Sequence, residues 1–121
     1  MPKVSKESAS GGGDYGMVVD HSEDVDGYTI NLITFREDID HAPLLKGLPD
    51  DRCQCPHWGY VFKGRITVRY DDHEEVCVAG DAFYMSPGHA PAAEAGTELL
   101  MISPTPEFNE LQAAMMKAMQ G

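Results

Sequence analysis

The regular spacing of turn residues between residues 60 and 103 most constrains the fold of this chain. Lys63-Gly64 has the composition of a hairpin turn, and residues 65–70 then alternate polar with apolar side chains. Further turns and short strands follow in the same rhythm, with turns at 71–73 and 79–81 and strands at 74–78, 82–86 and 98–103. Short strands separated by frequent turns predict an all-β sandwich or barrel.

The two ends of the chain differ from this pattern. Residues 1–13 are rich in Ser, Lys and Gly, and predict a flexible N-terminal tail or an edge arm. Residues 28–35 are β-branched and aromatic, as in a strand. We therefore expect a domain over 14–106, followed by a helix over 107–121 that packs on the barrel. The helix is predicted from apolar residues at helical spacing, namely Phe108, Leu111, Met115 and Met119.

Length and charge limit the classes of partner. The 121 residues fit one domain, and 20 acidic against 9 basic residues give a net charge of -11. This sign disfavours nucleic acids and anionic membranes. No apolar run approaches the roughly 20 residues of a membrane-spanning helix, and the N-terminus lacks the apolar segment of a signal peptide. We expect a cytoplasmic protein with reduced cysteines, because three is an odd number and Cys53 and Cys55 are poorly placed to bridge each other.

The run Cys-Gln-Cys-Pro-His places Cys53, Cys55 and His57 at alternate positions. In an extended chain these side chains share one face, and thiolates and imidazoles are favoured ligands of zinc and other soft or borderline metals. On a straight strand Cys53 and His57 lie roughly 13 Å apart, too far to share one ion. A bend at Pro56 would be needed to bring Cys53 into the same site. The alternative is that both cysteines only pack in the barrel.

Two segments resemble the conserved motifs of the small single-domain cupins, the RmlC-like cupins of type 2. The first is residues 60–65, Tyr-Val-Phe-Lys-Gly-Arg, and the second is residues 80–88, Gly-Asp-Ala-Phe-Tyr-Met-Ser-Pro-Gly. The resemblance covers roughly residues 51–91. It implies a double-stranded β-helix, also called a jelly roll, with a pocket at its centre.

The same resemblance implies a metal site whose usual residues are missing here. Counted from the two motifs, the family's four ligand positions, which usually hold three histidines and a glutamate, fall on Asp51, Cys53, His57 and Pro91. The chain offers replacements, because Cys55 and His57 lie further along the first motif and His89 lies two residues before the usual second-motif ligand. In the jelly roll the strands that carry the two motifs are antiparallel neighbours, so shifts of opposite sign in the sequence move the ligands of both motifs in the same direction along the barrel axis. We therefore predict a displaced site of Cys55, His57 and His89, with Cys53 as a conditional fourth ligand.

Three functions fit this site. Thiolate ligands favour zinc, with iron, copper, nickel and manganese as alternatives, either in a metal-dependent enzyme or in a non-catalytic module that binds a metal or a small molecule. The third is a metal-free jelly roll, in which His57 could act as an acid or base. The remaining histidines, His21, His41 and His73, have acidic, turn-rich surroundings typical of the solvated surface, and Cys77 has the pattern of a structural residue.

Alternation also assigns the two faces of the strands. The inward set should line a pocket for a small, partly apolar ligand, and it comprises Ile66, Val68, Tyr70, Phe83 and Met85. The outward face of the first motif carries Trp58, Tyr60 and Phe62, which is too apolar for free exposure. This face is either packed against the N-terminal segment or, as small cupins suggest, forms a homodimer interface.

Overall fold

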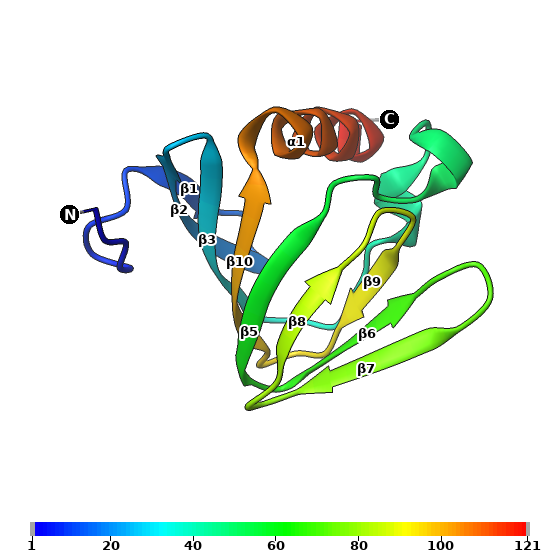
Figure 1. Ribbon diagram of the computed structural model, residues 1–121, viewed down its shortest axis with the longest axis horizontal. Coiled ribbons are helices and arrows are strands. Elements are labelled where there is room, and N and C mark those ends of the chain that lie inside the picture. Colours follow the sequence, from blue (N-terminus) through cyan, green and yellow to red (C-terminus); the bar gives the residue numbers. More distant parts are fainter. Residues whose placement is uncertain (1, 121) are drawn as a thin grey trace.

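The computed structural model describes residues 2–120, which form two antiparallel sheets and one C-terminal α-helix (Figure 1). The first sheet has six strands in the order β1-β2-β3-β10-β5-β8, and the second has four in the order β4-β9-β6-β7. The first sheet comprises β1 (Gly11–Asp14), β2 (Val18–Val25), β3 (Tyr28–Phe35), β10 (Glu98–Pro104), β5 (His57–Lys63) and β8 (Ala82–Met85). The second comprises β4 (Ile39–Asp40), β9 (Ala90–Ala93), β6 (Arg65–Arg69) and β7 (Glu74–Val78). The predicted all-β jelly roll is confirmed.

The hairpin between β5 and β6 is fixed by Gly64 and Thr97. Gly64 has a φ of 83°, and a Cβ atom there would lie 2.4 Å from Thr97 Oγ1, so only glycine fits. Thr97 in turn accepts a hydrogen bond from the backbone N of Arg65 at 3.0 Å. Beyond this turn Ile66 and Val68 are buried while their neighbours are more exposed, as the alternation predicts.

The N-terminal segment is more structured than the predicted tail. Residues 11–14 form strand β1, which pairs with β2 at the edge of the six-stranded sheet. Glycine permits this pairing, because a Cβ on Gly12 would lie 2.1 Å from the carbonyl oxygen of Asp20. Before β1, Lys6 Nζ lies 3.0 Å from Glu98 Oε1 on β10. The segment therefore matches the edge-arm alternative, and a flexible tail reaching residue 13 is wrong at its C-terminal end.

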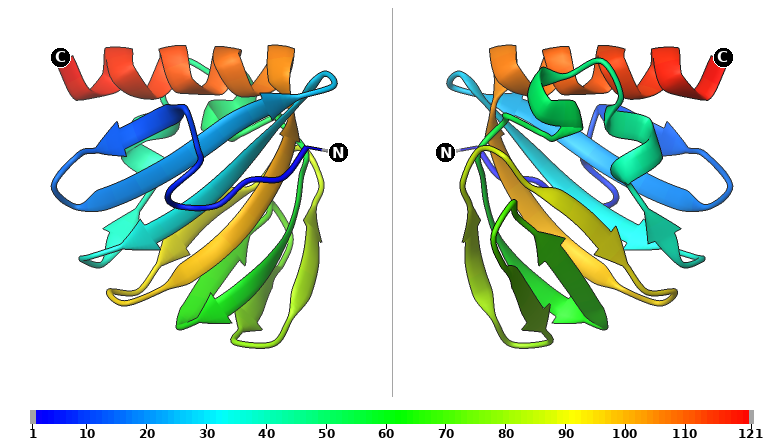
Figure 2. Two further views of the ribbon diagram at one scale, coloured as in Figure 1. Left: turned by 90° about the vertical axis from the view of Figure 1, so that its left-hand side faces the viewer. Right: turned by 90° about the vertical axis from the view of Figure 1, so that its right-hand side faces the viewer.

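Helix α1 (Thr105–Gln120) lies across one end of the barrel (Figure 2). It begins two residues before the predicted start, because Pro106 is accepted in a first helical turn, where its missing N–H has no intrahelical partner. Within the helix, Phe108 and Leu111 are buried, whereas Met119 of the predicted apolar face is 60% exposed. Within residues 2–120, no helix has the length and apolar character needed to span a bilayer.

Two clusters of buried apolar side chains stabilise the fold. The larger cluster lies between the two sheets and includes Val61, Leu99 and Met85. Of these, Val61 is fully buried. The smaller lies under α1 and the 3-10 helix η1 (Ala42–Leu45), and a second 3-10 helix, η2 (Pro49–Asp51), follows it. Both cysteines of the Cys-Gln-Cys run belong to this smaller cluster. The run therefore lies where the barrel end meets the helix.

Candidate metal centre

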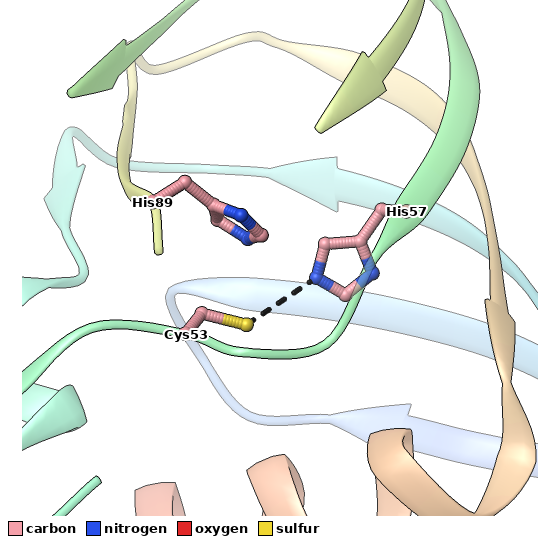
Figure 3. A group of neighbouring side chains, drawn as sticks. All are labelled: Cys53, His57 and His89. Atoms are coloured by element: carbon pink, nitrogen blue, oxygen red, sulfur yellow. Dashed lines mark hydrogen bonds between the residues drawn. The ribbon is translucent and has the colours of Figure 1, made fainter. Parts of the chain in front are cut away.

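Cys53, His57 and His89 converge at this end of the barrel. One potential ligand atom from each lies within 4.8 Å of the other two, and Figure 3 shows the three side chains facing a common point. All three are buried, with exposed fractions of 2%, 3% and 0%. A thiol and two imidazoles at this separation are a suitable donor set for a borderline or soft divalent metal.

A bend in the chain brings Cys53 to His57. Residues 54–56 lie outside any strand, and β5 begins only at His57, directly after Pro56. The Sγ of Cys53 is therefore 3.6 Å from His57 Nε2, far closer than a straight strand allows. The structure therefore has the bend before β5 on which the participation of Cys53 in the predicted site depends.

The second side of the cluster is attached through the main chain. Cys53 and His89 form an isolated antiparallel bridge, in which the Cys53 N–H donates to the His89 carbonyl at 2.8 Å. In return the Gly88 N–H donates to the Cys53 carbonyl, also at 2.8 Å. The ring of His89 thereby lies edge-on to the ring of His57, with 5.1 Å between the ring centroids.

Hydrogen bonds fix the protonation of His89. Its Nδ1 lies 2.7 Å from the carbonyl oxygen of Ser86, which can only accept, so Nδ1 carries the proton and Nε2 keeps its lone pair. His89 Nε2 is one of two buried side-chain N or O atoms without a hydrogen-bond partner among the described residues. His57 Nδ1 lies 2.7 Å from the Ser103 hydroxyl oxygen, which can donate or accept. A buried lone pair without a donor is costly unless another group supplies the missing interaction.

Burial keeps the cluster uncharged without a metal. Desolvation, with smaller contributions from the neighbouring His89 and His41, lowers the pKa of His57 to about 3. Burial also lowers the pKa of His89 and raises the pKa of the Cys53 thiol to about 11. The metal-free cluster at neutral pH therefore consists of two neutral imidazoles and a thiol, and a metal would need the thiolate.

The structure does not bring Cys55, the first-ranked cysteine, into this group. Its thiol donates to the carbonyl oxygen of Pro56 at 3.5 Å and lies beside the Ser103 hydroxyl. Cys55 is 3% exposed and packs in the smaller core cluster near the helix. The predicted order of the two cysteines is thus reversed, because the bend turns residues 53 and 55 to different neighbours.

His41 was expected at the solvated surface, but it lies beside the cluster. Its Nδ1 is 3.2 Å from the carbonyl oxygen of Pro91, and its ring packs edge-on against Phe35 at 5.8 Å. Burial lowers its pKa, and it acts electrostatically on both His57 and His89. Its placement depends on pairing between β4 and β9, and the two residues of β4 are too short a segment to carry a periodicity signal.

The predicted pocket residues do not all line one space. Val68, Tyr70, Phe83 and Met85 line a cavity of about 350 Å³, whereas Ile66 is buried in the core. The cavity lies against β6, β7 and β8, and the three converging donors are not in its lining. It borders their site, because Met85 pairs with His57 in the sheet and the rings of Tyr70 and His89 are 6.4 Å apart.

The aromatic face of β5 is exposed rather than covered by the N-terminal segment. Trp58, Tyr60 and Phe62 are 43%, 38% and 50% exposed, and Tyr84 of the neighbouring edge strand β8 is 51% exposed. The rings of Trp58 and Tyr84 lie 5.0 Å apart, so the exposed aromatic surface continues across both strands.

The sequence matches no protein-family model, and no curated protein is significantly similar to it. Solved structures are similar in fold. An RmlC-like cupin from Shewanella frigidimarina NCIMB 400 has a TM-score of 0.56 at 20% identity, over 84% of this chain and 88% of the other. A cupin-2 domain containing protein from the same strain has a TM-score of 0.51 at 16% identity, over 70% and 78%. The polyketide cyclase RemF from Streptomyces resistomycificus has a TM-score of 0.58 at 11% identity, over 86% and 79%. The chain therefore has the fold of the small cupins.

Proposed function

We propose that this protein binds a divalent metal ion through Cys53 Sγ, His57 Nε2 and His89 Nε2, and a small molecule in the adjoining cavity. The buried lone pair of His89 Nε2 is the observation that carries the proposal, because no described residue supplies it with a donor. A metal ion would occupy that position and would also accept the other two donors.

The donor set favours zinc. One thiolate and two imidazoles suit zinc better than iron or manganese, which prefer histidine with carboxylate. Three protein ligands leave a position for water or a substrate, where the bound ion would act as a Lewis acid. Iron, copper, nickel and manganese are the alternatives that metal analysis distinguishes.

The ligand is proposed to be small and partly apolar. Val68, Phe83 and Met85 present apolar atoms to the cavity of about 350 Å³, and Tyr70, whose ring lies 6.4 Å from that of His89, lines the same cavity. Binding without turnover is the second candidate, because the cavity lining excludes the three metal donors. Such a protein would hold its ligand beside the ion and not on it.

Metal analysis of untagged protein tests the site. Wild-type protein should hold close to one equivalent of metal, and Cys53→Ser, His57→Gln and His89→Gln should each lose it. Cys77→Ser is the matched control, since it removes a free thiol on β7 that is not one of the three converging donors. Circular dichroism checks that each variant is folded. A wild-type protein that takes up none of zinc, iron, copper, nickel or manganese refutes the proposal and leaves the metal-free jelly roll.

We further propose that the exposed aromatic surface of β5 and β8 mediates a homodimer, and that the protein is cytoplasmic. Trp58 and Tyr84 form a continuous apolar surface at a sheet edge, which a second copy would cover. Three free cysteines accord with a reducing compartment.

A further inference from the structure

Residues 86–89 cross from one sheet to the other and carry His89 at their end. Ser86 directly follows β8 of the six-stranded sheet, and His89 directly precedes β9 of the four-stranded sheet. The backbone of His89 is fixed by its bridge to Cys53. The ring is held separately, because its Nδ1–H donates to the Ser86 carbonyl at 2.7 Å. The direction of the His89 ring therefore depends on where Ser86 lies.

A tyrosine at the end of another strand fixes the position of Ser86. Tyr70 directly follows β6, and its hydroxyl oxygen accepts two hydrogen bonds from Ser86. The backbone N–H of Ser86 donates at 3.1 Å, and its hydroxyl donates at 3.3 Å. Since β6 and β8 belong to different sheets, these two bonds connect the sheets at the start of the crossing segment.

The Tyr70 side chain is itself held in place. The Tyr70 N–H donates to the His73 carbonyl at 2.8 Å, and the two rings stack with 4.8 Å between their centroids and 9° between their planes. The Tyr70 ring also lies edge-on to that of His89, at 6.4 Å between centroids. A phenylalanine at position 70 would keep both ring contacts and remove only the acceptor for Ser86.

We propose that Tyr70 is a positioning residue that holds the His89 ring, through Ser86, in the direction the metal site needs. Figure 3 shows the His89 ring facing Cys53 and His57. Bonds from zinc to a histidine nitrogen are only about 2.0 to 2.1 Å long, so a small displacement of the ring weakens coordination. Tyr70 acts through Ser86 and not as a ligand. The inference rests on the proposed metal-binding function.

The expected effect follows from what the substitution leaves behind. Loss of a hydrogen-bond partner of a metal-bound histidine typically lowers metal affinity about 10- to 100-fold. In Tyr70→Phe the Ser86 carbonyl is still present but loses its fixed position, so the fall should lie at the lower end, about tenfold. Ser86→Ala keeps the backbone N–H bond to Tyr70 and loses only the hydroxyl bond, so its effect should be smaller but in the same direction.

Proton NMR of the metal-free, full-length protein tests the hydrogen-bonded link itself. In the wild type the His89 Nδ1–H should give a downfield resonance that exchanges slowly with water, because the bond to Ser86 is short and buried. In Tyr70→Phe this resonance should move upfield and exchange faster, and the Ser86 amide should lose protection. Tyr15→Phe is the matched control, because Tyr15 is 58% exposed, and it should change neither signal.

Zinc titration and urea denaturation of the same proteins complete the test. Zinc affinity should fall about tenfold in Tyr70→Phe, less in Ser86→Ala, and not in Tyr15→Phe. A lower stability of Tyr70→Phe with an unchanged His89 resonance and wild-type zinc affinity would show a purely structural role and overturn the inference. If Tyr70→Phe does not fold, an unchanged resonance and affinity in Ser86→Ala overturn it instead.

The two measurements also separate this inference from the proposed function. If the His89 resonance changes as expected but wild-type protein binds no zinc or other metal, the link through Ser86 is supported and the proposed function fails. If the resonance changes while zinc affinity stays at the wild-type value, the positioning role is refuted and the metal site stands.

Discussion

Cys53 and His89 are joined through their backbones, because the Cys53 N–H donates to the His89 carbonyl and the His89 side chain takes no part in that bond. A substitution at either position therefore removes a donor atom without releasing the two chain segments from each other. The same bridge places the side chain of His89 within reach of Cys53 and His57. Loss of metal in a Cys53 or His89 variant can thus be separated from loss of the fold.

Metal binding should release one proton per ion at neutral pH. The pKa of the Cys53 thiol is raised by burial to about 11, so it is protonated before binding and must ionise to coordinate. His57 has a pKa lowered to about 3 and contributes no proton. Isothermal titration calorimetry in buffers of different ionisation enthalpy measures the number released. Affinity should rise about tenfold per pH unit through the neutral range.

Two variants make this measurement specific. Cys53→Ser should show neither metal binding nor proton release at neutral pH, because the thiol that ionises on binding is absent, whereas Cys77→Ser should behave as wild type. Release of two protons in the wild type would show that a second group, such as Cys55, ionises as well.

Metal-free protein should lose stability on acidification. The pKa of His57 is lowered by burial to about 3, so between the ordinary histidine value of 6.5 and about 3 the unfolded chain binds a proton that the folded chain excludes. The stabilising effect is therefore fully present above about pH 6.5 and is lost as the pH falls, by about 1.4 kcal/mol per pH unit for one such group. Urea denaturation near neutral pH and near pH 4.5, with chelator present, measures the difference.

His57→Gln should reduce this pH dependence, since glutamine does not titrate. The burial-lowered pKa of His89 adds a contribution of the same sign, so some dependence should remain. His73→Gln alters a histidine whose side chain is 50% exposed and is the matched control. An unchanged slope in His57→Gln would contradict the assignment.

Asp20→Asn should stabilise the protein. Asp20 is 7% exposed, and burial raises the pKa of its carboxyl because the charged form is poorly solvated there. It accepts from Asn31 Nδ2 at 3.0 Å, while the fully buried Asn31 Oδ1 has no partner among the described residues. An amide at position 20 removes the charge and can donate to that oxygen, for a gain of about 1 kcal/mol in the free energy of unfolding.

Thermal or urea denaturation of Asp20→Asn near neutral pH measures this gain. Glu37→Gln removes one charge from an exposed position and controls for the change in net charge. A loss of stability in Asp20→Asn would show that the ionised carboxylate is preferred at this position.

Trp58→Lys should convert a dimer into a monomer. A lysine would place a charge in the centre of the aromatic surface that Trp58 and Tyr84 share, and burying that charge without a partner is costly. Analytical ultracentrifugation or size exclusion with light scattering measures the mass. Met119→Lys is the control, because Met119 is 60% exposed on helix α1 and not on the sheet. A wild type that is already monomeric contradicts the proposed interface.

The fold could be predicted further than the site. The turn at Gly64 and the strand that follows it could be predicted, because a turn glycine and the alternation over 65–70 are local signals in the sequence. Strand β1 could not be recognised, because three successive glycines favour flexibility unless a partner strand is known. Its partner β2 is separated from it by a short turn, but glycine has no side chain to carry an alternation signal.

The site needed information that sequence spacing lacks. The motif framework predicts that His57 and His89 lie together, and they do, whereas the choice between Cys53 and Cys55 as their neighbour depends on the bend at Pro56. His41 was missed because the pairing of β4 with β9 gives its position. Each error arises where a short irregular segment, and not a regular strand, determines the direction of a side chain.

The close spacing of Cys53, Cys55 and His57 in the sequence would also affect the competition between folded and unfolded chains for the proposed metal. Cys53, Cys55 and His57 stay within five residues when the protein unfolds, so the denatured chain keeps a flexible local chelator of its own. In the proposed metal-binding function, metal held by that chelator would reduce the stabilisation that metal gives to the folded protein. The folded protein would keep an advantage through His89, which reaches the other donors only after two segments distant in the sequence have met. A newly synthesised chain that meets metal early could thus acquire the ion before the barrel closes around it.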